Sequence, residues 1–467
     1  MSVDVVILAA GQGSRMKSKL PKVLHKVGGK SMVQHVIDTA ASLNNESSNE
    51  KSNVNTHVVI GHGAELVKTS LEGQAVNFAL QAEQKGTGHA VAQAMPEVTE
   101  ESVVLVLYGD VPLTKPETMQ QMVELALSGD LALLTVNLKD PTGYGRIVRN
   151  DSDQVIAIVE HKDATSEQHK INEVNTGILA VNSKYLREWL PKLSSENAQG
   201  EYYLTDIIAM AADNGIAINA IQPKAEEEVQ GVNNRIQLAE LERWYQLQQA
   251  ESLMVNGATL ADPSRIDVRG NVTTGQDLLI DVNVVLEGNV VLGDNVVIEP
   301  NCYLKNCTVG AGTHIKANTV IEDTVIEDNC DIGPFARLRP GTQLATKAKV
   351  GNFVETKKTI VGEGSKINHL SYVGDAVLGN NVNVGAGTIT CNYDGVNKSM
   401  TEIGDNAFIG SNTALVAPVK VGATATVGAG STISKNVSDD ALAVTRVKQV
   451  EIKNWQRPVK KEKEKGN

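Results

Sequence analysis

The chain has 467 residues, a formal net charge of −12, 40 glycines and only 3% aromatic residues. This length allows two or three domains, and the acidic balance argues against general binding to nucleic acid or to a membrane surface. No apolar stretch approaches the ~20 residues of a membrane span, and the short apolar run at the start predicts no signal peptide. We therefore expect a soluble cytoplasmic protein.

Short apolar runs alternate with amphipathic segments over the first half of the chain. The apolar runs predict strands at 4–8, 57–60, 103–107, 131–136 and 155–160. The amphipathic segments predict helices near 31–42, 62–71, 88–95, 116–127, 183–190 and 203–213. This alternation predicts a Rossmann-like α/β domain over residues 1–232, with a mainly parallel sheet covered on both faces. The polar stretch 44–55 predicts a surface loop.

The second half has a different period. Residues 233–255 contain no glycine or proline and predict a linker helix. Beyond them, aliphatic residues recur every sixth position at Ile280, Leu286, Leu292, Ile298, Leu304, then Ile326, Ile332, Leu338, Leu344, Val350, and then Ile403, Ile409, Leu415, Val421, Val427, Ile433. Such hexapeptide repeats predict a left-handed parallel β-helix over 256–467, with the aliphatic residues inside. The segment 388–402 breaks the period and predicts a loop that leaves the coils.

The four cysteines all lie in this second half. They are Cys302, Cys307, Cys330 and Cys391. None forms a CxxC pair, and their spacing fits no zinc template, so we expect reduced cysteines that serve packing.

The stretch LAAGQGSRMKSKLPK, residues 8–22, directly follows the first predicted strand. Its glycines let backbone N–H groups approach a ligand closely, and four cations follow within eight positions: Arg15, Lys17, Lys19 and Lys22. Backbone N–H groups and cations together suit a polyphosphate. The stretch therefore predicts a phosphate-binding loop.

Three further features of the first half point to the same ligand. Asp110 follows the strand 103–107, at the carboxyl edge of the sheet, where a carboxylate can hold Mg²⁺. The glycine-rich turn 81–90 can bind a base or ribose, and Asn233 offers a second oxygen ligand for the metal. Each feature has a purely structural alternative: Asp110 as a cap of the next element, and Asn233 as the N-cap of the linker helix.

At this point a family resemblance is clear. Seven stretches resemble the signature stretches of sugar-1-phosphate nucleotidylyltransferases: LAAGQGSRM…PK, QAEQKGTGHA, YGDVP, DPTGYGR, IVEHKDA, NTGI and GVNNR. Four further stretches extend the likeness into the second half: GNFVETKK, NHLSYVGD, NVGAGTITCNYDG and ALAVTRV. Over nearly its whole length the chain resembles the bacterial bifunctional N-acetylglucosamine-1-phosphate uridylyltransferases/glucosamine-1-phosphate acetyltransferases.

The resemblance implies a first site that takes UTP, N-acetylglucosamine-1-phosphate and Mg²⁺. The implied residues are Leu8, Ala9, Ala10 and Gly11 along the nucleotide, Lys22 on its phosphates, and Gln81, Gly86 and Thr87 at the uracil. The residues near the sugar and metal would be Tyr108, Gly109 and Asp110, and the ligands of Mg²⁺ would be Asp110 and Asn233. The amino sugar would contact Gly145, Glu160 and Asn175. Arg15 is added because a guanidinium suits the departing pyrophosphate.

The resemblance also implies a second site, with His369 as the catalytic base of acetyl transfer. Glucosamine-1-phosphate would be bound by Arg339, Lys357, Tyr372 and Asn383, and acetyl-CoA by Ala386, Asn392, Tyr393, Ser411, Ala429 and Arg446. The assembly implied is a homotrimer. Ile367 stands where a small residue is expected, and His314 is expected to have no charged neighbour.

One alternative function remains open from the sequence. The chain could be a nucleotidylyltransferase with a single activity, whose β-helix is only a scaffold. A lone histidine is more often structural than catalytic, and only the resemblance favours His369 as a base.

Overall fold

The computed structural model describes residues 2–44 and 53–458. Contacts divide the chain into two compact units: Met1–Ser252 with Val268–Gly270, and Leu253–Asp267 with Asn271–Asn467. Most of the predicted polar loop, residues 45–52, and the last part of the basic tail, residues 459–467, lie outside the described residues.

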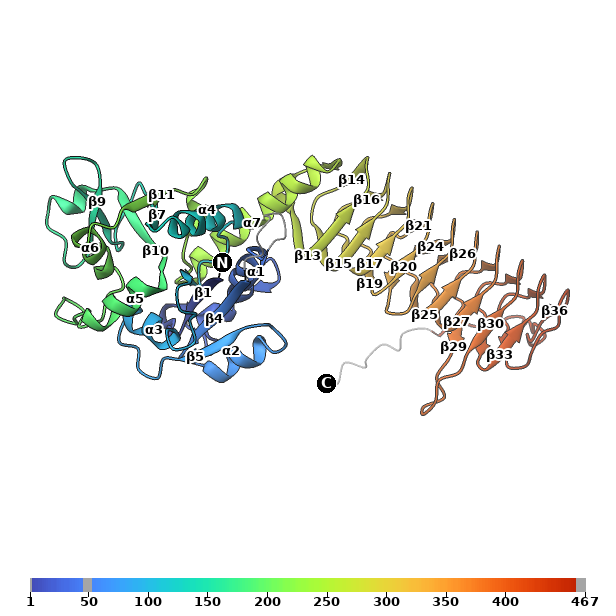
Figure 1. Cartoon of the computed structure of the whole chain (residues 1–467). Coiled ribbons are helices and arrows are strands. Elements are labelled where there is room, and N and C mark those ends of the chain that lie inside the picture. Colours follow the sequence, from blue (N-terminus) through green and yellow to red (C-terminus); the bar gives the residue numbers. More distant parts are fainter. Residues whose placement is uncertain (1, 45–52, 459–467) are drawn as a thin grey trace, which may run out of the picture. The chain divides into compact units, whose positions relative to one another are not determined.

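The first unit is built on one mixed sheet of nine strands (Figure 1). Its main path runs β11-β7-β10-β6-β1-β4-β5, and β8 and β9 join beside β10. The five predicted strands are present as β1 (Ser2–Ala9), β4 (Asn53–Ile60), β6 (Val103–Tyr108), β7 (Leu131–Asn137) and β9 (Val155–Val159). The pairs β1–β4, β1–β6, β4–β5 and β7–β11 are parallel, as predicted, whereas β10 runs antiparallel to β6 and β7.

Four strands of this nine-stranded sheet were not predicted. They are β5 (Asn77–Leu80), β8 (Arg146–Arg149), β10 (Glu173–Asn182) and β11 (Ile218–Ile221). β5 and β11 are the two edges of the main path, where a strand needs little apolar surface. β10 is central, but Gly177 has a φ of +88° there and interrupts the register with β7. A glycine of this kind marks a bulge and hides a strand from a propensity argument.

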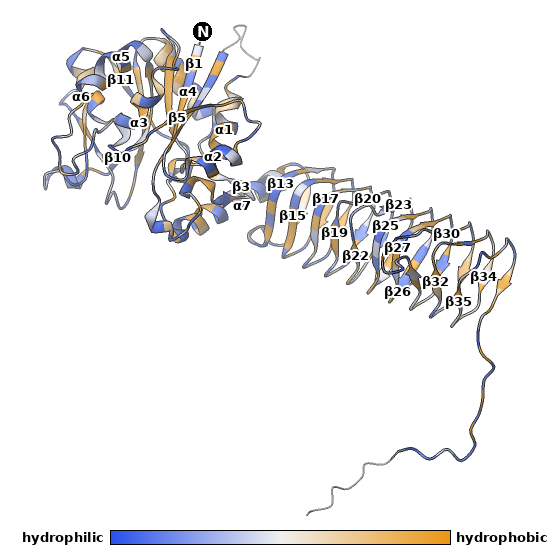
Figure 2. Cartoon of the chain, turned by 90° about the horizontal axis from the view of Figure 1, so that it is seen from below, coloured by the Kyte–Doolittle hydropathy of each residue, from blue (hydrophilic) through white to orange (hydrophobic). Residues whose placement is uncertain are grey.

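Six helices match the predicted ranges. They are α1 (Met32–Ser42), α2 (Ala64–Ser70), α3 (Thr87–Ala94), α4 (Pro116–Leu127), α5 (Ser183–Trp189) and α6 (Asp206–Asp213). The apolar residues of the sheet divide between two buried clusters, one with α1, α2 and α4 and one with α3, α5 and α6. The sheet is therefore covered on both faces, and apolar residues predominate along its strands (Figure 2).

A 21-residue helix, α7 (Arg235–Val255), follows the last strand of this sheet. Its N-terminus is capped by Asn234, whose Oδ1 accepts hydrogen bonds from the backbone N–H groups of Ile236 (2.9 Å) and Gln237 (3.0 Å). The alternative in which Asn233 caps the helix is therefore wrong. All residues of α7 up to Ser252 belong to the first unit.

The second unit is a parallel β-helix of stacked coils, from β12 (Ala258–Leu260) to β36 (Leu442–Ala443) (Figure 1). Successive coils pair in register, for example Ile298 with Ile315 and Ile315 with Ile332. All sixteen aliphatic residues of the six-residue series are buried, each at most 4% exposed. The left-handed hexapeptide β-helix predicted from the period is confirmed.

An excursion from the coils is present, but it is shorter than the predicted 388–402. β29 (Ile389–Cys391) and β30 (Thr401–Ile403) pair with neighbouring strands inside the stack, and only residues 392–400 leave it, with an isolated antiparallel bridge between Tyr393 and Lys398. The four cysteines are free thiols, and burial raises the pKa of Cys302 and Cys330 to about 11 and that of Cys307 to about 12. Cys302, Cys307 and Cys330 are therefore unreactive packing thiols, whereas Cys391 is only partly buried.

Candidate functional sites

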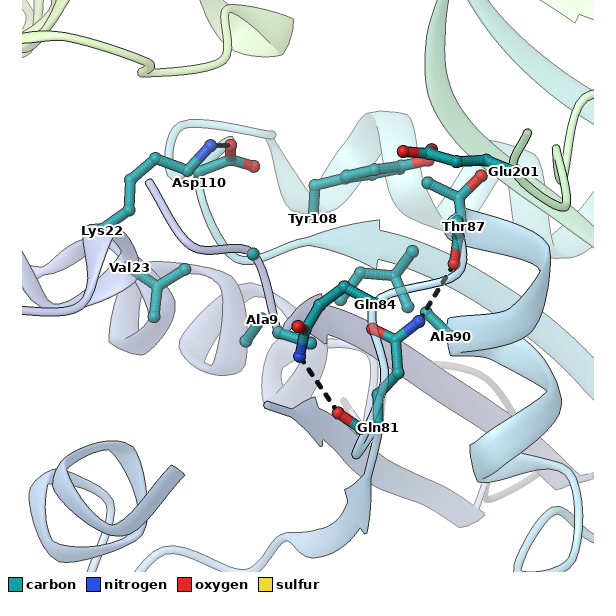
Figure 3. A pocket seen from close by; sticks show the side chains of 14 residues that line it. Ala9, Lys22, Val23, Gln81, Gln84, Thr87, Ala90, Tyr108, Asp110 and Glu201 are labelled. Carbon is teal, nitrogen blue, oxygen red and sulfur yellow. Dashed lines mark hydrogen bonds and ion pairs between the residues drawn. The ribbon is translucent and has the colours of Figure 1, made fainter. Parts of the chain in front are cut away.

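A pocket of about 290 Å³ opens at the carboxyl ends of β1 and β6 in the first unit (Figure 3). Ten of the residues that the resemblance implied line it: Leu8, Ala9, Ala10, Gly11, Lys22, Gln81, Gly86, Thr87, Tyr108 and Asp110. Gly109 follows Tyr108 and donates its backbone N–H to the carbonyl of Leu8 (3.0 Å). The ends of these parallel strands are where ligands of open α/β sheets bind.

Cations and oxygen ligands meet at one end of this pocket. Lys22 Nζ forms an ion pair with Asp110 Oδ2, and both side chains are largely buried. The Oδ1 atom of Asn233 accepts hydrogen bonds from Arg15 Nη2 (2.9 Å) and from Lys22 Nζ (3.3 Å). Because Asp110 contacts a lysine and its side chain caps no helix, the capping alternative for this residue is also wrong.

The stretch 8–22, predicted to bind phosphate, folds back on itself at Gly13. This residue has a φ of +61°, and a Cβ atom placed on it would lie 2.6 Å from Cβ of Lys22. Only glycine combines that conformation with so close an approach. The glycine therefore places the two ends of the stretch side by side and brings Lys22 next to the pocket.

The other end of the pocket is built from the turn 81–90 and the segment 201–204. Gln81 is buried and donates from Nε2 to the carbonyl of Gly86 (3.1 Å). A Cβ atom on Gly86 would lie 2.6 Å from the carbonyl oxygen of Tyr202, so this position requires glycine. Thr87 Oγ1 accepts from the backbone N–H of Leu204 (3.1 Å). These bonds join two distant segments into one rigid wall.

Gly145, Glu160 and Asn175 lie together beside the pocket. The backbone N–H of Asn175 donates to the carbonyl of Gly145 (2.9 Å), and a Cβ atom on Gly145 would lie 3.4 Å from Glu160 Oε1. Burial raises the pKa of Glu160, although a hydrogen bond from Thr205 (3.1 Å) opposes the shift. Burial, with the charges of Asp110 and Glu160, also raises the pKa of Tyr108.

Sequence reasoning missed four residues of this pocket: the apolar Val23 and Ala90, and the polar Gln84 and Glu201. Gln84 donates from Nε2 to the carbonyl of Gln81 (3.3 Å) (Figure 3). Gln84 lies within the stretch QAEQKGTGHA, residues 81–90, so this motif could have indicated it. Glu201 comes from a polar segment after α5 with no distinctive spacing, and only the folded chain brings it to the pocket.

In the second unit, five residues form a row along one corner of the β-helix. Each lies two positions after an inward aliphatic residue, and the register of successive coils places them one above another: Asn352, His369, Ala386, Ser411 and Ala429. The backbone N–H of Gly387 donates to the carbonyl of His369 (3.4 Å), and that of Asn412 donates to Ala386 (2.7 Å). Arg446 packs over Gly430, beside the last member of the row. Of these, Asn352 was missed by sequence reasoning.

The residues implied for the sugar phosphate lie on strands next to this corner. Arg339 follows β22 (Arg337–Leu338) and forms an ion pair of 2.7 Å with Glu355. Glu355 is in register with Tyr372 on the neighbouring coil, and Lys357 with Gly374. The neighbouring Lys398 lowers the pKa of Lys357, and Arg339 contributes in the same direction. Asn383 is in register with Lys366, on the face that also carries His369.

The loop after β29 approaches these cations. Asn392 Nδ2 donates to Asp375 on β27 (Tyr372–Leu378), and Lys398 faces Lys357. Tyr393 is 59% exposed. The loop thus brings Asn392 and the predicted phosphate ligand Lys357 into one region of the unit.

Two expectations for this unit are wrong. His314 has a charged neighbour, because its Nε2 lies 2.8 Å from Glu299 Oε1 on the preceding coil. Ile367 does not stand at a position that needs a small residue. It is fully buried and lies in register between Val350 and Val384, so it belongs to the inward aliphatic series.

Two further kinds of feature were sought, clusters of metal-ligating side chains and membrane-spanning helices. Within residues 2–44 and 53–458 no group of three or more histidine, cysteine or acidic side chains is arranged to hold a metal ion. In the same described ranges no helix is long and apolar enough to cross a membrane.

The two units define a class of protein, a nucleotidyltransferase joined to a hexapeptide-repeat transferase. Family models match the MobA-like NTP transferase domain at residues 5–171, the GMPPB C-terminal domain at 268–354, and the bacterial transferase hexapeptide (six repeats) at 400–435.

Curated relatives match over almost the entire chain. The chain is 64% identical over 458 residues to the Bifunctional protein GlmU of Marinobacter nauticus, with 98% of this chain and 99% of that protein covered. It is 60% identical over 459 residues to the Bifunctional protein GlmU of Cellvibrio japonicus, with 98% and 100% covered. The chain belongs to the GlmU family of bifunctional proteins.

Proposed function

We propose that the chain makes UDP-N-acetylglucosamine in two steps. The second unit transfers an acetyl group from acetyl-CoA to the amino group of glucosamine-1-phosphate. The first unit transfers uridylyl from UTP to the resulting N-acetylglucosamine-1-phosphate and releases pyrophosphate. The observation that carries this proposal is full-length membership in a family named bifunctional. That membership favours two activities over the single-activity alternative.

For uridylyl transfer, the chain's own residues supply positioning and charge neutralisation. The sugar phosphate attacks the α-phosphorus of UTP, and the bond to the departing pyrophosphate breaks, so no enzyme nucleophile is needed. Arg15 and Lys22 are proposed to neutralise the charge that develops on the pyrophosphate. Gln81, Gly86 and Thr87 are proposed to hold the uracil, and Glu160 and Asn175 the amino sugar.

The residues present fit a bound Mg²⁺. Lys22 Nζ interacts with both Asp110 Oδ2 and Asn233 Oδ1, so two oxygen donors already converge on one positive charge. Carboxylate and amide oxygens are donors that Mg²⁺ accepts, with substrate phosphates completing its shell. When bound, the ion would polarise and neutralise phosphate oxygens.

For acetyl transfer, His369 is proposed as the general base. It takes the proton from the ammonium of glucosamine-1-phosphate, so that the free amine can attack the thioester of acetyl-CoA. Arg339, Lys357, Tyr372 and Asn383 are proposed to bind the sugar phosphate. The row from Ala386 to Ala429 favours a groove for the long acetyl-CoA molecule, and Asn392, Tyr393 and Arg446 are proposed to contact the same ligand.

We propose a homotrimer held together by the β-helix. Its exposed corner carries residues with positive φ, and at three successive coils these are apolar: Phe335, Phe353 and Leu370. They are 50%, 56% and 63% exposed, and the two phenyl rings stack at 5.3 Å. An exposed apolar row next to His369 favours burial against a second copy.

The cytoplasm is the proposed compartment. Free thiols at all four cysteines suit a reducing environment.

Two substitutions in the full-length protein test the proposal. Asp110→Ala should abolish pyrophosphate release from UTP and N-acetylglucosamine-1-phosphate and leave thiol release from acetyl-CoA intact. His369→Ala should lower thiol release by about 10²–10⁴-fold, the usual contribution of a general base, and leave pyrophosphate release intact. Equal loss of both activities in either variant would contradict two separate sites.

A further inference from the structure

Asn352 and His369 lie side by side on adjacent coils. Asn352 ends β24 (Lys349–Asn352), His369 ends β26 (Lys366–His369), and the two residues are directly in register. The Oδ1 atom of Asn352 lies 2.7 Å from Nδ1 of His369. An amide oxygen only accepts hydrogen bonds, so this contact requires a proton on Nδ1.

The backbone on both sides of His369 is also fixed. Its carbonyl accepts a hydrogen bond from Ser371 Oγ (2.8 Å), and the backbone N–H of Leu370 donates to the carbonyl of Asn352 (3.0 Å). The imidazole is exposed, so its second nitrogen is open to a ligand. The ring is therefore held at Nδ1 and available at Nε2.

We propose that Asn352 is a positioning residue for acetyl transfer: it holds the neutral His369 in the tautomer with the proton on Nδ1, which makes Nε2 the atom that accepts the proton of the substrate ammonium. This inference rests on the proposed acetyl transfer. The second partner of a catalytic histidine commonly fixes which ring nitrogen is the base. Here that partner is an uncharged amide, so it orients the ring without adding a negative charge beside it.

Few charged groups compete with this contact. On the flanking strand β24 the charged residue is Lys349, and on β26 it is Lys366, which pairs with Lys349. On the other side β28 (Asn383–Val384) carries none. Glu355, ion-paired with Arg339, and Tyr372 lie beyond the corner on the next face.

The test is the pH profile of thiol release in full-length variants, with saturating acetyl-CoA and glucosamine-1-phosphate. Asn352→Ala should lower kcat about tenfold, which corresponds to about 1.4 kcal/mol for the lost hydrogen bond, with little change in KM. Asn352→Asp keeps the acceptor oxygen and adds a negative charge, which favours the imidazolium. It should therefore move the acidic limb upward by about one pH unit and retain most of the rate above that limb.

Asn368→Ala removes the same side chain from the residue next to His369 and should behave as wild type. The inference is overturned if Asn352→Ala keeps the wild-type kcat, or if Asn352→Asp leaves the acidic limb in place. His369→Ala in the same assay distinguishes a failure of the proposed base from a failure of the proposed role of Asn352. A nearly unchanged rate there would contradict the proposed base itself, whereas its loss together with a wild-type Asn352→Ala would contradict only the role of Asn352.

Discussion

Asn233 and Asn234 are neighbours in the chain, but their side chains do different things. Asn234 Oδ1 caps helix α7, whereas Asn233 Oδ1 accepts hydrogen bonds from Arg15 and Lys22 at one end of the pocket. Asn234 thus stabilises a helix, and the residue before it contributes an oxygen to the proposed metal site. The pair offers a matched test of the two roles.

Asn233→Ala should lower uridylyl transfer at least tenfold and raise the Mg²⁺ concentration needed for half-maximal rate, because a proposed ligand is lost. Asn234→Ala should instead lower the free energy of unfolding by about 1 kcal/mol, the usual cost of an N-cap. Pyrophosphate release across a Mg²⁺ titration and thermal unfolding check both variants. The interpretation fails if Asn234→Ala shifts the Mg²⁺ dependence as strongly as Asn233→Ala does.

Truncation should show that the uridylyl site needs helix α7. Arg235 donates from Nε to the carbonyl of Met16 (3.3 Å), and Glu242 Oε2 accepts from the backbone N–H of Gly28 (2.7 Å). A fragment of residues 1–252 should keep uridylyl transfer, whereas residues 1–232, without Asn233 and these contacts, should lose most of it.

Sedimentation of the same fragments tests the assembly. Neither fragment contains the β-helix, so both should be monomers. A stable trimer of residues 1–252 would contradict the proposed interface.

The acidic limb of the pH–rate profile of uridylyl transfer should follow the ionisation of Glu160. Burial raises its pKa, and the hydrogen bond from Thr205 favours the ionised form and so lowers it. Only the ionised carboxylate accepts hydrogen bonds from the sugar at both oxygens, so the rate should fall as pH falls through this raised pKa. Thr205→Val removes the opposing bond and should move the limb to higher pH. A limb that moves to lower pH, or stays in place, would exclude Glu160 as its origin.

The apolar corner row should matter for assembly more than for folding. Asn occupies the equivalent positive-φ position on other coils, at Asn301, Asn318 and Asn412. Phe353→Asn should therefore relieve backbone strain and preserve the thermal stability of the single chain, because Asn tolerates this conformation better than Phe. It should also weaken the trimer, seen as dissociation on dilution in light scattering. An unchanged trimer at every concentration would refute this part of the proposal.

The β-helix was predictable almost coil by coil, because each inward position repeats the same demand for an aliphatic side chain. Val350, Ile367 and Val384 stand in one buried ladder, and the mistaken doubt about Ile367 came from judging a single position without its register. In the α/β unit the long apolar strands were clear, whereas β10 was hidden by the bulge at Gly177.

The sites were predictable only in part. Asp110 could be placed at a sheet edge because it follows a buried strand. The meeting of Lys22, Asp110 and Asn233, separated by up to 211 residues, depends on the tertiary fold. The contact between Asn352 and His369 depends on coil length, because a coil of 17 residues puts them in register. No local motif encodes such a distance.

One measurement on the full-length protein tests the central claim, that a single chain carries both reactions in sequence. Glucosamine-1-phosphate, UTP and Mg²⁺ are supplied with and without acetyl-CoA, and free thiol and pyrophosphate are followed together. The account predicts pyrophosphate release only when acetyl-CoA is present, with thiol appearing first and the two products reaching equal amounts. Pyrophosphate release that is independent of acetyl-CoA, or no thiol release at all, would contradict it.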